Sequence, residues 1–116
     1  MVNSMSGHRV PNMPGGGGKT RFYSATKFAV TALLEGWRQE MRDLGHNIRI
    51  GQLSPGVVET EFALAMSGDQ QKADQLYSSM ECLTAEDMAD CLKFILSAPI
   101  RMQIHDILVR PTQQKS

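Results

Sequence analysis

The feature that most constrains the fold is a helix-period pattern over residues 22–44 that leads directly into a short β-type segment. Gly45 follows the pattern as a helix stop. Residues 47–53 then form a β-type run that ends at a Ser-Pro-Gly turn. The order helix, tight turn, strand is typical of a parallel α/β sheet, in which ligands bind beyond the carboxyl ends of the strands. The apolar positions of the predicted helix are Val30, Leu33, Leu34, Trp37, Met41 and Leu44.

The remaining segments fit this architecture. Residues 1–4 are interpreted as the end of one strand and residues 104–110 as a last strand, with an amphipathic helix that Thr84 caps and Pro99 ends between them. The Gly- and Pro-rich residues 4–21 predict a loop, and the polar tail from Thr112 is expected to fray. The less regular stretch 62–80 forms either ordinary packing or a mobile lid over an apolar substrate.

Composition bounds the class of protein. The length of 116 residues suits one domain, and the 12 basic and 12 acidic residues balance, so we expect no nucleic-acid partner. No apolar run approaches the ~18 residues of a membrane span, and the N-terminus lacks the features of a secretory signal, so the chain is expected to be cytoplasmic. The two cysteines and three histidines show no metal-ligand spacing. We therefore expect reduced thiols, structural or solvent-facing histidines and no metal site.

A tyrosine and a lysine, Tyr23 and Lys27, stand one helical turn apart near the start of the predicted helix. Residues at i and i+4 share a helix face. An ammonium close to a phenol favours the phenolate, and such a pair suits acid–base catalysis. The same spacing also occurs in ordinary surface pairs, so other residues must support a functional interpretation.

The segment Gly18-Lys19-Thr20 matches the end of a phosphate-binding P-loop. The first glycine of that motif would have to be residue 13, which is Met13. A flexible glycine loop is therefore the better interpretation.

Three motifs in order resemble the classical short-chain dehydrogenases/reductases. The family pattern is a serine that ends one strand, Y-x-x-x-K at the opening of the next helix, and P-G-x-x-x-T after the following strand. The resemblance covers essentially the whole chain and is closest to the animal NADP-dependent subgroup that reduces steroid ketones or oxidises farnesol-like alcohols. It implies that residues 1–116 are the C-terminal catalytic portion of a Rossmann-like, doubly wound parallel sheet. The matching segments are Asn3-Ser4-Met5-Ser6-Gly7, Tyr23-Ser24-Ala25-Thr26-Lys27 and Ser54-Pro55-Gly56-Val57-Val58-Glu59-Thr60.

The resemblance implies catalytic roles for three side chains. Tyr23 would be the catalytic acid or base, and Lys27 would assist it and bind the nicotinamide ribose, so both also contact the cofactor. Ser4 would hold the substrate oxygen, with Ser6 as an alternative. The distance from Ser4 to Tyr23 is nineteen residues, against about thirteen to fifteen in the family, and a glycine loop absorbs the difference at small entropic cost.

The resemblance also assigns a cofactor-binding loop after the predicted strand. Pro55 and Gly56 would shape its turn, while Val58 would contact the nicotinamide carboxamide through its backbone and Thr60 through its hydroxyl. NADP(H) is expected in preference to NAD(H). The family's first βαβ half is not matched, because the chain has no T-G-x-x-x-G-x-G turn that would approach the pyrophosphate.

Two hypotheses remain open at this point. In the first, the residues belong to an NAD(P)-dependent oxidoreductase that transfers a hydride to or from an apolar carbonyl or alcohol. In the second, they form a catalytically inactive fragment that acts at most as a dimerisation partner through the helix at residues 22–44.

Overall fold

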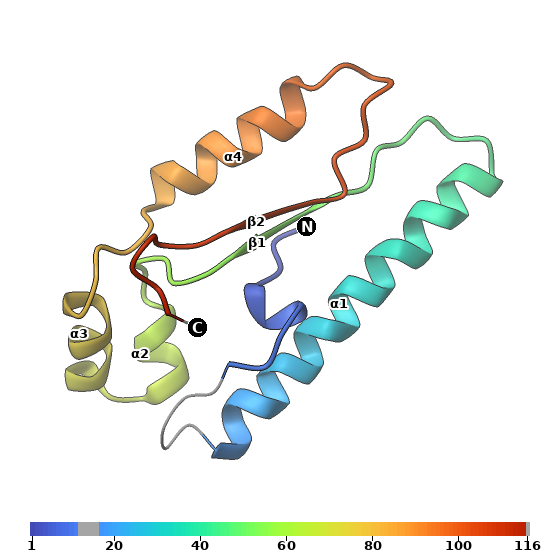
Figure 1. Ribbon diagram of the computed structural model, residues 1–116. Helices are drawn as coiled ribbons and strands as arrows, with labels where there is room; N and C mark the ends of the chain where they lie inside the picture. Colours follow the sequence, from blue (N-terminus) through green and yellow to red (C-terminus); the bar gives the residue numbers. More distant parts are fainter. Residues whose placement is uncertain (12–16, 116) are drawn as a thin grey trace.

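The computed structural model describes residues 1–11 and 17–115 and places two parallel strands between helices (Figure 1). The predicted α/β class with a parallel sheet is confirmed. The elements in chain order are η1 (Met5–Gly7), α1 (Gly17–Asp43), β1 (Gln52–Pro55), α2 (Phe62–Ser67), α3 (Gln70–Ser78), α4 (Ala85–Ser97) and β2 (Asp106–Val109).

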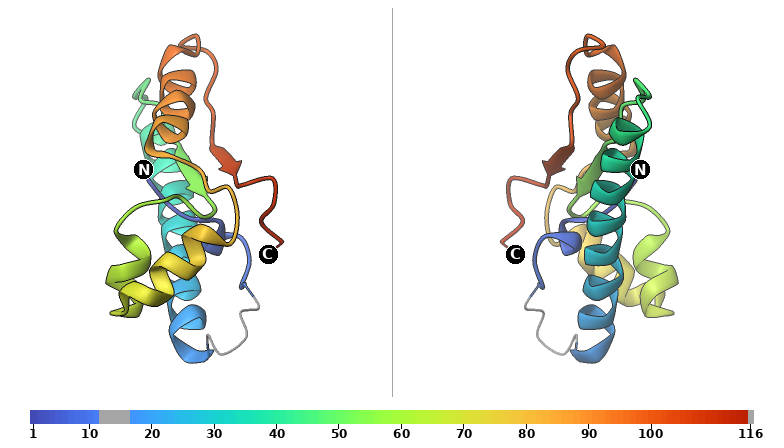
Figure 2. Two further views of the ribbon diagram at one scale, coloured as in Figure 1. Left: turned by 90° about the vertical axis from the view of Figure 1, so that its left-hand side faces the viewer. Right: turned by 90° about the vertical axis from the view of Figure 1, so that its right-hand side faces the viewer.

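Strand β1 lies at the centre of the sheet. On one side it pairs in parallel with β2, with Leu53 opposite Ile107. On its other side β1 pairs with the first residues of the chain. Asn3 N–H donates to the Leu53 carbonyl at 2.8 Å, and Leu53 N–H donates to the Met1 carbonyl at 2.9 Å. Residues 1–4, predicted as the end of a strand, thus pair with β1 only through an isolated parallel bridge at Val2 and form no regular strand. Helices α1 and α4 lie on opposite faces of the strands, and α2 and α3 lie beyond the carboxyl end of β1 (Figures 1 and 2).

Helix α1 starts at Gly17, earlier than the predicted residue 22. Residues 12–16 lie outside the described part of the chain, but residues 17–21, which were predicted as loop, are helical, and η1 interrupts the same predicted loop. A glycine costs only about 1 kcal/mol in a helix, so a long helix can extend through it once nucleated. The predicted end is confirmed: Gly45 has φ +71°, and its N–H donates to the Arg42 carbonyl at 3.0 Å.

The apolar face predicted for α1 is covered only in part. Leu34 is buried, whereas Leu33, Trp37 and Leu44 are exposed. Periodicity correctly predicted the helix, but the depth to which each position is buried depends on which elements pack against it. None of the described helices is long and apolar enough to cross a membrane.

The strand predicted at residues 47–53 begins later, at Gln52. Its pairing partner β2 begins only at Asp106, so the preceding residues have no ladder to join. The Gln103 side chain donates to the Ile50 carbonyl at 3.2 Å, and the Met1 ammonium donates to the Gly51 carbonyl at 2.8 Å. These contacts satisfy the carbonyls without a strand.

Residues 113 and 114 of the tail that was predicted to fray are docked on the rest of the fold, and residue 116 lies outside the described part of the chain. Gln114 Oε1 accepts a hydrogen bond from Val57 N–H at 3.0 Å, and Gln113 Oε1 accepts one from Glu81 N–H at 3.2 Å. Side-chain amides thus satisfy backbone donors of two other loops.

Candidate active site

Tyr23 and Lys27 come together in the N-terminal half of α1, and both side chains are half-buried. Lys27 Nζ lies 5.6 Å from the centroid of the Tyr23 ring. The Tyr23 ring also packs against Phe62, with centroids 5.6 Å apart and ring planes tilted by 51°. Phe62 is the first residue of α2, so the segment interpreted as either packing or a lid touches the tyrosine directly.

Ser4 follows the segment that pairs with β1 through the Val2 bridge, and it caps η1. Its Oγ accepts a hydrogen bond from Ser6 N–H at 3.1 Å. Ser4 is half-buried and Ser6 is buried, which favours Ser4 as the hydroxyl that a substrate could reach. Among the described residues, no hydrogen bond joins Ser4 to Tyr23 or Lys27, so the structure brings the Tyr–Lys pair together but does not link the serine to it.

Gly7 is where the segment that carries Ser4 contacts α1. A Cβ on Gly7 would lie 2.6 Å from Asn3 Nδ2 and 2.8 Å from the Lys27 carbonyl oxygen. The Thr31 hydroxyl also donates to the Gly7 carbonyl at 3.1 Å. The S-x-x-G spacing is therefore a packing requirement, because only glycine allows η1 to approach the turn of α1 that carries Lys27.

The cofactor-loop candidates follow β1. Pro55 ends the strand opposite Val109, and Gly56 N–H donates to the Val109 carbonyl at 2.7 Å. A Cβ on Gly56 would lie 2.8 Å from Arg110 Cβ and 2.9 Å from Met5 Sδ. The turn thus lies in close contact with the end of β2 and with η1, and only a residue without a Cβ fits at position 56.

Val58 forms an isolated parallel bridge with Leu83. Glu59 N–H donates to the Leu83 carbonyl at 2.9 Å, and Leu83 N–H donates to the Val57 carbonyl at 3.1 Å. This pattern leaves the N–H and C=O of Val58 on the opposite side of the segment. No hydrogen bond among the described residues uses them. An adjacent donor and acceptor match a primary carboxamide, so Val58 fits the nicotinamide contact that the resemblance implies.

Thr60 stands at the entry to α2. Its Oγ1 accepts a hydrogen bond from Phe62 N–H at 3.2 Å, and its own O–H can still donate. The hydroxyl oxygen of Tyr77 accepts a hydrogen bond from Ala63 N–H at 3.1 Å, and this bond joins α3 to α2. The helices beyond the loop are therefore tied to each other and, through Phe62, to Tyr23.

A polar cluster that we did not predict joins the segment after η1 to both strands. Asp106 Oδ2 accepts from Gln52 Nε2 at 2.6 Å and from Ser54 Oγ at 3.0 Å, and lies 2.7 Å from His8 Nε2. Gln52 and Ser54 are buried. No local pattern signals this cluster, because its members come from three separate segments. No group of three His, Cys, Asp or Glu side chains in the described residues is placed to hold a metal ion.

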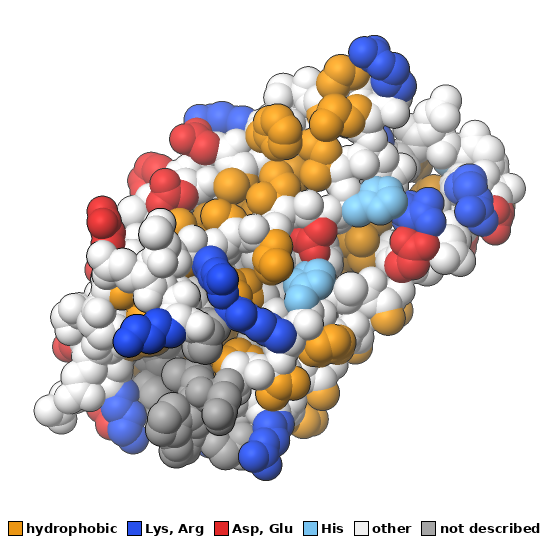
Figure 3. Space-filling view, viewed as in Figure 1, with side chains coloured by type: hydrophobic (Ala, Val, Ile, Leu, Met, Phe, Trp, Pro, Cys, Tyr) orange, Lys and Arg blue, Asp and Glu red, His pale blue; other side chains and the backbone are white. Residues whose placement is uncertain are grey.

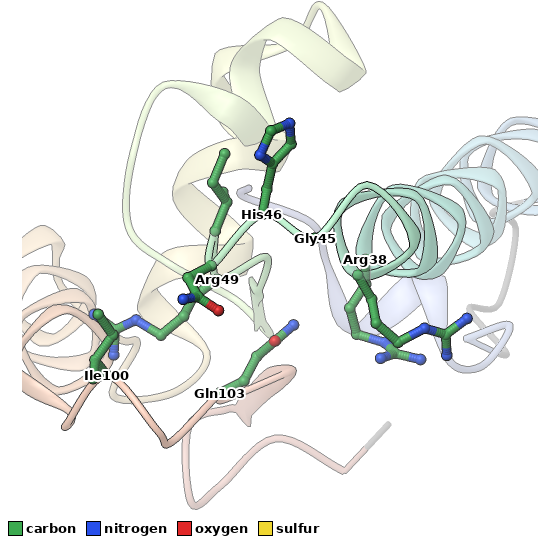
Figure 4. A pocket seen from close by; sticks show the side chains of 9 residues that line it. Arg38, Gly45, His46, Arg49, Ile100 and Gln103 are labelled. Carbon is green, nitrogen blue, oxygen red and sulfur yellow. The ribbon is translucent and has the colours of Figure 1, made fainter.

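A polar hollow of about 280 Å³ lies near the C-terminal end of α1, at the opposite end of that helix from Tyr23 (Figure 4). Its guanidinium groups already have partners. Arg38 donates to Glu35 at 2.6 and 2.8 Å, and this hydrogen bonding lowers the pKa of Glu35 to about 2. Arg49 donates to the Ala98 carbonyl at 2.7 Å.

Comparison with known proteins supports the resemblance. The family model described as short chain dehydrogenase matches residues 2–71. A bovine protein named dehydrogenase/reductase SDR family member 11 is 51% identical over 114 residues, which are 97% of this chain and 43% of that protein. Farnesol dehydrogenase of Aedes aegypti is 32% identical over 114 residues, 98% of this chain and 42% of that protein. The solved closed form of serine dehydrogenase complexed with NADP⁺ superimposes with a TM-score of 0.84 at 26% identity, covering 99% of this chain and 44% of that one.

The chain thus spans less than half the length of these relatives. The family match includes Ser4, the Tyr23–Lys27 pair and the loop at residues 55–60. Together with the parallel α/β structure, it confirms the family predicted from the three motifs. The chain belongs to the short-chain dehydrogenase family.

Proposed function

We propose that residues 1–116 form the acid–base portion of an NAD(P)-dependent oxidoreductase. Its substrate would be an apolar small molecule with a carbonyl or with a secondary or allylic alcohol. The observation that carries this proposal is the Tyr23–Lys27 pair. The Tyr23 ring packs on Phe62, and Phe62 follows the loop in which the backbone groups of Val58 have no hydrogen-bond partner among the described residues.

Each candidate residue has a defined task in this proposal. Tyr23 gives a proton to the substrate oxygen when a carbonyl is reduced and takes one when an alcohol is oxidised. Lys27 places a positive charge beside the Tyr23 ring. Ser4 holds the substrate oxygen. A bound nicotinamide would supply or accept the hydride.

The cofactor and substrate classes rest on separate support. Val58 and Thr60 offer groups that suit the carboxamide of a nicotinamide. The structural neighbour with a TM-score of 0.84 is complexed with NADP⁺, and this favours NADP(H) over NAD(H). Exposed apolar side chains on α2, namely Phe62, Leu64 and Met66, favour an apolar substrate. A relative named farnesol dehydrogenase supports the same class.

The proposal is tested by replacing the aligned segment of the bovine relative with residues 1–116 and following NADPH oxidation with apolar ketones and aldehydes. In this chimera, Tyr23→Phe should lower kcat by at least about 100-fold, because it removes the proton donor. NADPH binding, followed by nicotinamide fluorescence, should change little.

Tyr77→Phe is the matched control, because Tyr77 lies on α3 and, within the described chain, its hydroxyl accepts a hydrogen bond from the backbone N–H of Ala63. It should retain turnover. A chimera that folds and binds NADPH but turns over equally well with Phe at position 23 would remove Tyr23 from the mechanism. A folded, NADPH-binding chimera without turnover would contradict the proposed function itself.

A second candidate function is that of a non-catalytic association partner. It is favoured by the apolar side chains that α1 leaves exposed, including Phe22, Leu33 and Trp37. Such a stripe suits contact with another helix.

A further inference from the structure

A hollow of about 460 Å³ lies between the segment after η1 and strand β2. Met5 and Leu108 provide its apolar surface, and His8, Arg9 and Arg110 provide its polar surface. Figure 3 shows the corresponding face, where basic and histidine side chains gather among hydrophobic ones over η1 and the strands. The volume is within the range of small-molecule sites, roughly 300–1,000 Å³.

Two guanidinium groups in this hollow lack a carboxylate partner among the described residues. Arg9 has one weak contact, from Nη2 to Met5 Sδ at 4.0 Å, and its buried Nε has no hydrogen-bond partner. Arg110 is exposed at the end of β2 and makes no ion pair within the described chain. By contrast, Arg38, which lines the polar hollow near the C-terminal end of α1, forms an ion pair with Glu35.

An acidic group beside the hollow, Asp106, is engaged through one of its two oxygens. Asp106 Oδ2 lies 2.7 Å from His8 Nε2 and accepts hydrogen bonds from Gln52 and Ser54. His8 lines the hollow and lies beside this carboxylate, whose other oxygen, Asp106 Oδ1, is buried without a hydrogen-bond partner in the described chain. Arg9 and Arg110 each place a guanidinium that forms no ion pair within the described chain beside the apolar surface of the hollow.

We propose that this hollow binds a small carboxylate with an apolar tail. A guanidinium presents parallel N–H donors that match the two oxygens of a carboxylate. The buried Arg9 Nε would gain its missing acceptor, and the half-exposed Leu108 and adjacent Met5 would contact the tail. The site is separate from Tyr23 and Lys27, and its occupancy does not depend on dehydrogenase activity.

The test uses the ¹⁵N-labelled 116-residue chain and titrates it with octanoate, octanol and acetate. Octanoate should give saturable amide shifts centred on residues 8–10 and 108–110. Octanol lacks the charge and acetate lacks the tail, so each should bind at least about tenfold more weakly.

Arg110→Gln should weaken octanoate binding by at least about tenfold without loss of folding, because the side chain is exposed. Arg9→Lys keeps the charge and the apolar stem but removes the planar fork, and it should also weaken binding. The matched control is Arg101→Gln, an exposed arginine after α4 that should leave binding unchanged. Equal binding of octanoate and octanol, shifts centred on α1 or α4, or equal affinity in Arg110→Gln would each overturn the proposal.

Discussion

Gly7 and Gly56 are the two glycines whose missing side chains matter most for the candidate site. Each lies where two segments approach too closely for a Cβ: η1 against α1 at Gly7, and the loop after β1 against β2 and η1 at Gly56. The first approach positions Ser4 relative to the helix of Tyr23 and Lys27. The second shapes the loop that leads to Val58. At the scale of single residues, the site depends on packing as much as on its reactive groups.

Gly7→Ala should destabilise the protein by about 1–3 kcal/mol, the usual cost of overpacking a filled site. The added methyl would meet the Lys27 carbonyl oxygen at 2.8 Å, and backbone in a helix cannot move aside cheaply. Urea denaturation followed by circular dichroism measures the change in the free energy of unfolding.

Gly36→Ala is the control for this substitution. Gly36 lies in α1 with no atom within 4 Å of the position that a Cβ would take. Because alanine is the better helix former, this variant should be more stable by roughly 0.5–1 kcal/mol. A Gly7→Ala variant that loses no stability, while Gly36→Ala gains it, would show that η1 does not pack on α1 as described.

At the scale of elements, α4 shows how a short motif sets a helix boundary. Thr84 Oγ1 accepts from Asp87 N–H at 3.3 Å, and Asp87 Oδ2 accepts from Thr84 N–H at 2.8 Å. This capping box confirms the predicted cap, and the helix ends at Ser97, before Pro99, as predicted. None of the residues of α4 is fully buried, so the capping box is a specific contact on which the first turn of this helix depends.

Thr84→Ala should lower the free energy of unfolding by about 1 kcal/mol, because it leaves a backbone donor of the first turn without its acceptor. Amide hydrogen exchange should locate the loss in the first turn of α4. Thr112→Ala, an exposed threonine after β2, should change stability by less than about 0.5 kcal/mol. Faster exchange spread evenly over the whole chain would contradict a local capping role.

At the scale of the whole molecule, the features that local sequence controls were predictable. The end of α1 at Gly45, the cap at Thr84 and the parallel order of the elements all follow from short-range patterns. Three ordered motifs were enough to predict the family. The catalytic roles of Ser4, Tyr23 and Lys27 stay predictions.

The features that escaped prediction depend on contacts between distant segments. Gln114 bonds to Val57 across 57 residues, and Asp106 meets His8 from the far end of the chain, so no window of sequence contains both partners. The start of α1 was missed because glycine-rich sequence was interpreted by its propensity alone. Tertiary context overrides such a weak local preference.

The exposed apolar surface of α1 has a consequence for the whole molecule. Phe22, Leu33, Trp37 and Leu44 are exposed and follow one another at spacings that place them on one side of the helix. Figure 1 shows no other element on the outer side of α1. A helix of 27 residues is about 40 Å long, enough for a helix–helix interface of ordinary size.

We therefore expect the chain to self-associate through α1, with a dimer visible by sedimentation velocity at micromolar concentration. The double variant Leu33→Gln, Trp37→Gln should shift the equilibrium to monomer, because it places two amides in the centre of the apolar stripe. The matched control is Phe94→Gln, Leu96→Gln on α4, where both side chains are also exposed. If the α4 variant abolishes association and the α1 variant does not, the interface lies on the opposite face of the sheet and α1 has no role as a dimerisation surface.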